Sequence, residues 1–161
     1  MATAHVSRII NTVIEAEGPI HQDRLAKVVA GAFGLNRVSE DRRRAIQRVV
    51  PRQYRRPDGE DFYWPLDVDP SSWRMVRRPM TGASRPLEEV SLIEIGNAML
   101  IAAEESGGSE KDELKREALA LFGGRRLTAA VSDRLDEAID RAVARGLLRL
   151  SSTGFFIAST D

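Results

Sequence analysis

The sequence predicts a mainly α, α+β fold of two tandem winged helix-turn-helix-like units, each with three helices and a β-hairpin. Apolar residues recur at helical spacing in six segments, and every third segment is followed by two short strand-like runs around turn-forming residues. The two halves of the chain show the same order, and an internal repeat supports a fold better than either half alone. A generic α+β domain is the alternative.

In the first half, Gly18-Pro19 ends a first helix with an apolar face of Val6, Ile9, Ile10, Val13 and Ile14. Gly34 ends a second helix, whose inward residues are Leu25, Val28, Val29, Ala32 and Phe33. Ser39 is a suitable N-cap for a third helix over about residues 40–50, which Pro51 cannot continue. The run YRRPDGEDFYW then predicts a hairpin over residues 54–64, turning at Pro57-Asp58-Gly59.

The second half repeats this order. Its first helix carries Leu92, Ile95, Met99 and Leu100, and its second carries Leu114, Ala118, Leu121 and Phe122. The third, over about residues 131–145, carries Leu135, Ala138, Ile139, Ala142 and Val143. A hairpin is expected over residues 147–158, turning at Ser152-Thr153-Gly154. The helix ends match as well, because Ala32-Phe33-Gly34 corresponds to Leu121-Phe122-Gly123.

These patterns divide the chain into three parts. Residues 1–64 form the first, basic unit, residues 65–86 a proline-rich linker, and residues 87–161 the second, acidic unit. Residues 1–86 carry 15 Lys and Arg against 10 Asp and Glu, whereas residues 87–161 carry 9 against 14. This asymmetry indicates units with different partners, or units that attract each other. Within the linker, a short strand is expected to pack on one unit at Trp73, Met75 and Val76.

The composition excludes several kinds of site. The chain has 161 residues and no cysteine, which removes disulfides, thiolate metal sites and cysteine nucleophiles. Its two histidines are too few for most zinc sites. No apolar run reaches membrane-spanning length and no signal-peptide pattern is present, so we expect a cytoplasmic protein, or a piece of one, without membrane contact.

Three stretches resemble a known bacterial family: EGPIHQDRLAKVVAGAFGLNRV, FYWP and LEEVSLIEIGNAML. The family is a domain of unknown function near the C-terminal end of large superfamily I helicase-like proteins, which often also carry a very-short-patch-repair-type endonuclease domain. The resemblance covers most of the chain and implies a helicase-associated accessory module without catalytic residues. The chain departs from it at residues 37–41, where the family has a glycine-containing pattern before its third helix.

Residues 39–56, SEDRRRAIQRVVPRQYRR, hold seven arginines. On a helical wheel, the apolar residues between Ala45 and Val50 form one arc, and most of the arginines form the opposite one. In a winged helix, that exposed face of the third helix enters a major groove while the wing meets phosphates. We therefore expect nucleic-acid contact through Arg43, Arg44, Gln47, Arg48, Arg52, Arg55 and Arg56.

The expected ligand is double-stranded or forked DNA, bound weakly and with little sequence preference, because phosphate contacts carry no sequence information. RNA contact and a merely solvated helix face are the alternatives for these arginines. The alternative function is a protein–protein interaction module with no nucleic-acid contact. Arg42 falls inside the apolar arc, so we expect it to extend to solvent or to pair with Asp61.

The outer face of the third helix in the second half is different, because it carries four acids and three arginines: Asp133, Arg134, Asp136, Glu137, Asp140, Arg141 and Arg145. Glu137 and Arg141 are expected to pair, because they lie four residues apart. Phosphate would be repelled there as much as attracted. We expect this unit to contact the first unit, a second copy, the rest of a larger helicase-like protein or another protein. A free-standing transcription regulator is a third hypothesis, but the sequence shows no dimer interface for it.

No motif for nucleotide binding or hydrolysis is present, so we predict a non-enzymatic protein without cofactor or metal. The carboxylate pairs at 15/17, 88/89 and 104/105 lie at helix ends or on solvated faces. His21 is expected to cap or pack against the second helix. Phe62, Tyr63 and Trp64 either seat the hairpin on its core or stack on bases.

Overall fold

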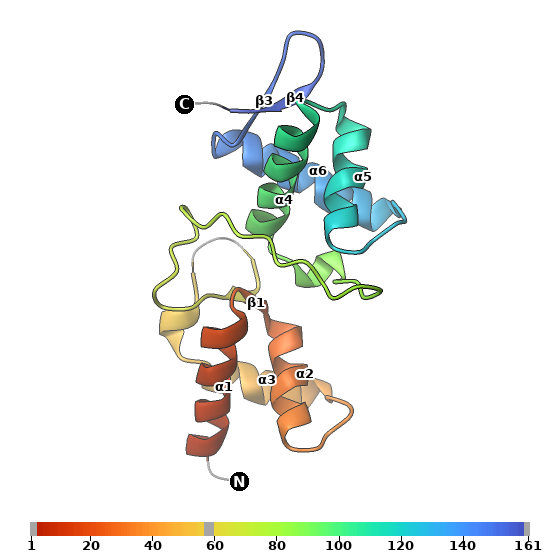
Figure 1. The fold of residues 1–161 in the computed structure, drawn as a ribbon. Coiled ribbons are helices and arrows are strands. Elements are labelled where there is room, and N and C mark those ends of the chain that lie inside the picture. The colour runs from red at the N-terminus through yellow and green to blue at the C-terminus, as the bar shows by residue number, and fades with distance from the viewer. Residues whose placement is uncertain (1–2, 57–59, 160–161) are drawn as a thin grey trace. The chain divides into compact units, whose positions relative to one another are not determined.

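A computed structural model describes residues 3–56 and 60–159, and it divides the chain into two compact units, residues 1–72 and 73–161 (Figure 1). In the described residues, each unit contains three α-helices and one two-stranded antiparallel sheet. The predicted fold class is confirmed: the protein is mainly α, with two helix-plus-hairpin units. The boundary between units 1 and 2 falls inside the segment that the sequence predicts as a linker.

Unit 1 follows the order of a winged helix, with a first strand between its first two helices. Ser39 caps the third helix as expected, because its Oγ accepts the Arg42 N–H at 3.3 Å. His21 caps the second helix through Nδ1, which accepts the Asp23 N–H at 3.2 Å. The elements are α1 (Thr3–Glu17), β1 (Ile20–His21), α2 (Gln22–Ala32), α3 (Glu40–Val49), the 3₁₀-helix η1 (Arg52–Tyr54) and β2 (Phe62–Tyr63).

The sheet of unit 1 differs from the predicted local hairpin. Strand β2 pairs with β1, which comes from the connection between α1 and α2, in a register that sets Tyr63 opposite Ile20. On the other side of Tyr63, Arg55 forms a single bridge, and the Trp64 N–H donates to the Tyr54 oxygen at 2.9 Å. The predicted turn, residues 57–59, lies outside the described residues. A two-residue strand such as β1 is too short for periodicity to reveal.

Unit 2 repeats this order and confirms the second predicted hairpin. Its elements are the 3₁₀-helix η2 (Leu87–Glu89), α4 (Leu92–Ser106), α5 (Lys111–Leu121), α6 (Ala129–Ala144), β3 (Leu148–Leu150) and β4 (Phe156–Ala158). Strands β3 and β4 pair around Gly154, and Ser109 forms a bridge to Phe156. Ser109 lies between α4 and α5, so it occupies the position that β1 occupies in unit 1.

The internal repeat is regular enough to match residues one by one. Helices α1 and α4 have 15 residues each, α2 and α5 have 11 each, and both pairs are separated by 89 positions. Phe33 therefore matches Phe122, and Gly34 matches Gly123. In the third helices the apolar pattern is separated by 93 positions, which matches Ile46 with Ile139. Helices α3 and α6 themselves begin 89 positions apart, at Glu40 and Ala129, so the difference of four residues lies within the third helix, where α6 has one more turn before its apolar pattern.

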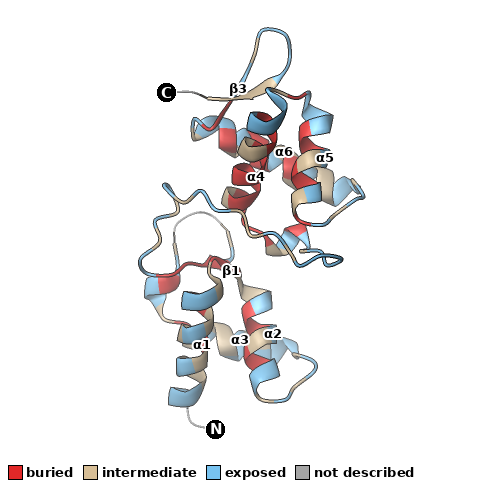
Figure 2. Cartoon of the chain, viewed as in Figure 1, coloured by how far each residue is buried: buried red, intermediate tan, exposed pale blue. Residues whose placement is uncertain are grey.

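Each unit has its own core, but the third helices are buried to different extents (Figure 2). Ile10, Ile14 and Leu25 are fully buried in unit 1, whereas α3 itself has no buried residue. Helix α6 buries Leu135, Ala138, Ile139 and Ala142. One face of α3 therefore remains partly open where the matching face of α6 is closed.

The segment that precedes α4 is part of unit 2. The Asn97 side chain donates to the Trp73 and Met75 oxygens at 3.2 and 3.1 Å, and Val76 packs on the core. Residues 73–76 thus pack on unit 2 as expected, but they form no strand. Glu94 is fully buried and accepts hydrogen bonds from Arg77 and Arg85, which fixes the rest of the segment against α4.

Alanine at Gly123 is expected to destabilise unit 2 more than alanine at Gly34 destabilises unit 1. Both glycines have positive φ, so either substitution costs about 1–2 kcal/mol of backbone strain. A Cβ at Gly123 would lie 2.3 Å from the Ala83 oxygen, whereas a Cβ at Gly34 meets nothing within 4 Å. The clash adds about 1–3 kcal/mol. Urea unfolding followed through amide NMR signals of each unit measures the difference, and equal losses would contradict this packing.

Candidate nucleic-acid interface

A hollow of about 470 Å³ lies in unit 1 beside α3 and the β2 segment, and we call it the arginine hollow. Five of the seven residues expected to contact nucleic acid line it: Arg44, Gln47, Arg48, Arg55 and Arg56. Its other lining residues are Gln22, Glu60, Asp61, Phe62 and Tyr63. Segments that are separate in sequence thus bring four guanidinium groups to one concave surface.

The fold of the chain after α3 places the two arginine pairs together. Pro51 ends α3, and the single turn of η1 reverses the chain so that Arg55 returns beside the helix. Tyr54 is buried in the core and anchors this turn. The Arg55 guanidinium then donates to the backbone oxygen of Gln47 at 3.0 Å. Arg55 and Arg56 are therefore held next to the arginines of α3.

Arg55 and Arg56 are held by neutral backbone oxygens. Arg56 donates to the Gln53 oxygen at 2.8 Å and to the Pro65 oxygen at 3.2 Å. A carbonyl partner fixes the position of a guanidinium without cancelling its charge, and the remaining N–H groups can still donate to an anion. These two side chains are therefore oriented and remain positively charged.

Arg43, by contrast, is engaged by acids. Its guanidinium lies 2.6 Å from Asp23 Oδ1 and 2.5 Å from Glu40 Oε2. The hydrogen bonds that it donates to Glu40 and then to Asp23 raise the pKa of Arg43, and the bond from Arg43 lowers the pKa of Glu40. Arg43 does not line the arginine hollow. Arg44 lines it, but its Nε also contacts Glu40 at 3.1 Å.

Arg48 and Arg52 have guanidinium groups without a hydrogen-bond or ion-pair partner among the described residues. Arg48 lies on the last turn of α3 and lines the hollow, whereas Arg52 is exposed on η1 and lies outside it. Of the two expectations for Arg42, extension to solvent is confirmed, because the residue is exposed, and pairing with Asp61 is wrong, because Arg42 lines an apolar surface on another side of α3.

Two acids reduce the positive charge of the hollow. Glu60 and Asp61 line it together with four arginines, which leaves an excess of two positive charges among its described lining residues. An excess of this size favours polyanions but does not provide the long basic surface of a strong DNA-binding protein.

Gln22 also lines the hollow, although the sequence did not predict it as a contact residue. It is the first residue of α2, its backbone N–H donates to the backbone oxygen of Asp61 at 2.9 Å, and it lines the hollow together with Gln47. Glutamine amides can pair with base edges, adenine in particular. The position depends on β1 pairing with β2, which no local pattern predicted.

The wing aromatics do not form a surface for base stacking. Phe62, Tyr63 and Trp64 are exposed by 3, 6 and 0%, because they seat the β2 segment on the core. The His21 ring packs edge-on against Phe62 with centroids 5.1 Å apart. The packing interpretation of these aromatic residues is therefore confirmed, and the stacking interpretation is wrong.

Helix α6 presents no matching set of free arginines. Arg134, expected on the outer face, turns inward and donates to the Leu87 oxygen at 2.6 Å. Asp136 accepts from the buried Lys115 at 2.8 Å. The predicted pair of Glu137 and Arg141 is present at 3.5 Å. In the described part of unit 2, these charges stabilise the fold or pair with each other.

The described residues contain no group of three or more His, Asp or Glu side chains that could hold a metal ion. Within the same residues, no helix is both long enough and apolar enough to cross a membrane.

Comparison with known proteins finds one family. Residues 2–44 match the family described as "Protein of unknown function (DUF3320)", so a DUF3320 domain covers α1, β1, α2 and the first half of α3. Neither the curated proteins nor the solved structures contain a match. The part of the predicted resemblance that concerns a domain of unknown function is thus confirmed for these residues, and the association with helicases stays a prediction.

Proposed function

We propose that unit 1 binds double-stranded or forked DNA weakly and with little sequence preference through the arginine hollow. The observation that carries this proposal is the meeting of four arginines and two glutamines from α2, α3 and the two residues after η1 in one open concavity. The planar guanidinium group of arginine can donate two parallel hydrogen bonds to one phosphate. These side chains therefore suit a DNA backbone that lies against the arginine hollow.

The contacts have different expected roles. Arg48, Arg55 and Arg56 would provide most of the phosphate attraction, because none of them forms an ion pair with a carboxylate among the described residues, although Asp69 lies near enough to Arg56 for their charges to interact. Among the described residues that line the hollow, Gln22 and Gln47 carry the amide side chains that could pair with base edges. Most of the binding energy is therefore independent of sequence, and affinity should fall steeply with salt.

We further propose that the chain is a non-catalytic accessory module of a larger helicase-like DNA-processing protein. The support for this context is the family resemblance of the sequence, and the support for a non-catalytic role is the lack of a catalytic motif in it. Unit 2 would then contact the rest of that protein or another protein.

A protein–protein interaction module without nucleic-acid contact is the second candidate. Two observations favour it: Glu60 and Asp61 weaken the charge of the hollow, and unit 1 also has an open apolar surface between its helices. The two candidates predict different results with DNA.

Fluorescence anisotropy of a labelled duplex and a matching fork, titrated with the full chain at low salt, tests the DNA proposal. We expect roughly micromolar binding to both, with similar affinity for unrelated sequences and a marked loss on adding salt. Absence of binding at low salt would contradict DNA contact and leave the protein-interaction candidate.

Arg43→Ala is expected to change DNA affinity less than twofold, whereas Arg48→Ala should reduce it about fivefold, as for a lost contact of about 1 kcal/mol. The reason is that Asp23 and Glu40 already neutralise Arg43, while no acid pairs with Arg48 in the described residues. The same anisotropy titration compares both variants. Equal losses would show that the ion pairs of Arg43 open when DNA binds.

A further inference from the structure

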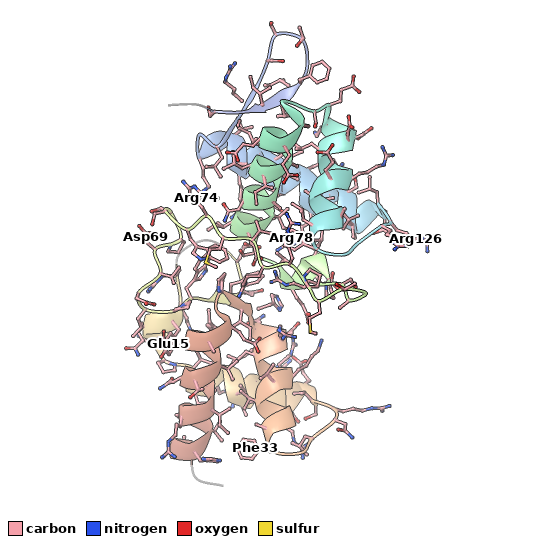
Figure 3. All side chains as sticks on the ribbon, viewed as in Figure 1. Glu15, Phe33, Asp69, Arg74, Arg78 and Arg126 are labelled. Carbon is pink, nitrogen blue, oxygen red and sulfur yellow. The ribbon has the colours of Figure 1, made fainter. Side chains whose placement is uncertain are left out.

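Unit 1 has an open apolar groove of about 280 Å³ between its three helices. It is lined by Thr3, Val6, Val29, Ala30, Phe33, Leu35, Arg42, Ala45, Ile46 and Val49. Phe33, at the C-terminal end of α2, is only partly buried, and Figure 3 shows its ring at the surface of the unit. The groove and the arginine hollow share no lining residue, so the two sites can be altered separately.

The matching surface of unit 2 is closed. At a separation of 89 positions, the residues of α1 and α2 that line the groove match Leu92, Ile95, Ala118, Leu119 and Phe122, none more than 5% exposed. At a separation of 93, Ala45, Ile46 and Val49 match Ala138, Ile139 and Ala142, none more than 1% exposed. A related apolar surface is thus buried in one unit and open in the other.

The segment over residues 85–90, which contains the 3₁₀-helix η2, covers this surface in unit 2. The Arg85 N–H donates to the Phe122 oxygen at 2.9 Å, and its guanidinium lies over the Phe122 ring. Leu87 and Val90 then enter the core at 3 and 0% exposure. Arg134 of α6 fixes the segment by donating to the oxygens of both residues, at 2.6 and 2.5 Å.

No such segment covers the groove among the described residues of unit 1. The matching glycines Gly34 and Gly123 show that the neighbouring surface is covered in unit 2 and open in unit 1. A Cβ at Gly123 would meet Ala83 and Ser84, whereas a Cβ at Gly34 would meet nothing within 4 Å. Arg42 lines the groove, and none of the described residues pairs with its guanidinium. Unit 1 therefore offers apolar sites comparable to those that hold residues 85–90 in unit 2. Arg42, which matches Leu135 at the separation of 93 positions, adds an arginine donor next to the position that matches Arg134.

We propose that the apolar groove binds a short segment of a partner protein that has the chemistry of residues 85–90. Such a segment has two apolar side chains three residues apart, with acids between them, as Leu87-Glu88-Glu89-Val90 has. The apolar side chains fill the space between Val6, Phe33 and Ile46. Arg42 donates to the backbone or to an acid of the segment, the part that Arg134 plays in unit 2.

A synthetic peptide with the sequence of residues 85–91 tests this proposal against the full chain. We expect millimolar peptide to shift the NMR signals of Val6, Phe33 and Ile46, and not those of α4–α6, whose own surface is already covered. A control peptide with Leu87→Asp and Val90→Asp should cause no shift. Shifts with both peptides, or none with either, would overturn the proposal.

Two variants at exposed positions test the site without threatening the fold. Ala45→Glu places a charged chain in the groove and should abolish peptide binding, and Arg42→Ala should weaken it about threefold to tenfold. Arg48→Ala, which alters the arginine hollow, should leave it unchanged. Unaltered binding in Ala45→Glu, or self-association of the chain through the groove without peptide, would contradict a partner segment as the occupant.

Discussion

Replacing Arg48, Arg55 and Arg56 together with alanine is expected to lower DNA affinity at low salt about a hundredfold, for all sequences alike. Each side chain is expected to contribute about 1 kcal/mol through a phosphate contact, and three such losses multiply. The slope of log affinity against log salt should flatten by about one unit for each contact removed. Anisotropy titrations at several salt concentrations measure both effects.

The matched control removes the same charge from unit 2. Arg125, Arg126 and Arg149 are exposed, so replacing them with alanine changes the net charge equally without altering the hollow. We expect this control to lower affinity only slightly, through the general field of the protein. A similar loss in both triple variants would show that net charge, and not the arginine hollow, accounts for binding.

Glu94→Gln is expected to destabilise unit 2 by about 3 kcal/mol. Glu94 is fully buried, and its carboxylate accepts from the Arg77 guanidinium at 2.7 Å, the Arg77 N–H at 2.8 Å and the Arg85 guanidinium at 2.5 Å. Removing one partner of a buried charge network leaves the other charges uncompensated. Urea unfolding followed through the amide signals of α4–α6 measures the loss.

The exposed neighbour Glu88 supplies the control, since Glu88→Gln should change stability by less than about 0.5 kcal/mol. Comparable losses of stability at Glu88 and Glu94 would contradict this explanation, because burial of the carboxylate would then not determine the loss.

The same carboxylate makes the stability of unit 2 depend on pH. Burial raises the pKa of Glu94, but hydrogen bonds from Arg85 and Arg77 outweigh it, so the net pKa lies below the usual value. A lowered pKa contributes stability above the unfolded pKa near 4.5, which is lost as the pH falls through the folded value. Unit 2 should therefore lose stability below about pH 4.5, and Glu94→Gln should flatten this dependence.

Much of the fold follows from local patterns in the sequence. Gly34, Ser39 and Pro51 place helix ends where the structure has them, because the conformational preferences of these residues depend little on tertiary context. The repeat was predictable from the recurrence of one pattern in both halves, and the second hairpin lies within the expected range.

The first sheet was predicted only in part, for a physical reason: Arg55 and Tyr63 pair as the predicted hairpin requires, but strand β1 was not expected. Ile20 and His21 form a strand only because Phe62 and Tyr63 lie beside them, which is a contact across about forty residues. Local periodicity cannot report such a pairing. Gln22 was missed for the same reason, since its position in the hollow follows from that strand.

The candidate site was predictable in outline only. The helical spacing of Arg44, Gln47 and Arg48 placed them on one face, and the structure adds Arg55 and Arg56 to it. The pairing of Arg43 with Asp23 depends on how α2 and α3 cross, so the sequence could not separate this arginine from its neighbours. The apolar groove became recognisable only through comparison with the covered surface of unit 2.

The most direct test of the account is an NMR titration of the full chain with a short duplex. We predict shifts of the side-chain amide signals of Gln22 and Gln47 and of the Nε–H signals of Arg48, Arg55 and Arg56, all reversed by added salt. Signals of the apolar groove, such as Phe33, should not move. Shifts confined to unit 2, or none at DNA concentrations that saturate the anisotropy signal, would contradict the arginine hollow as the DNA site.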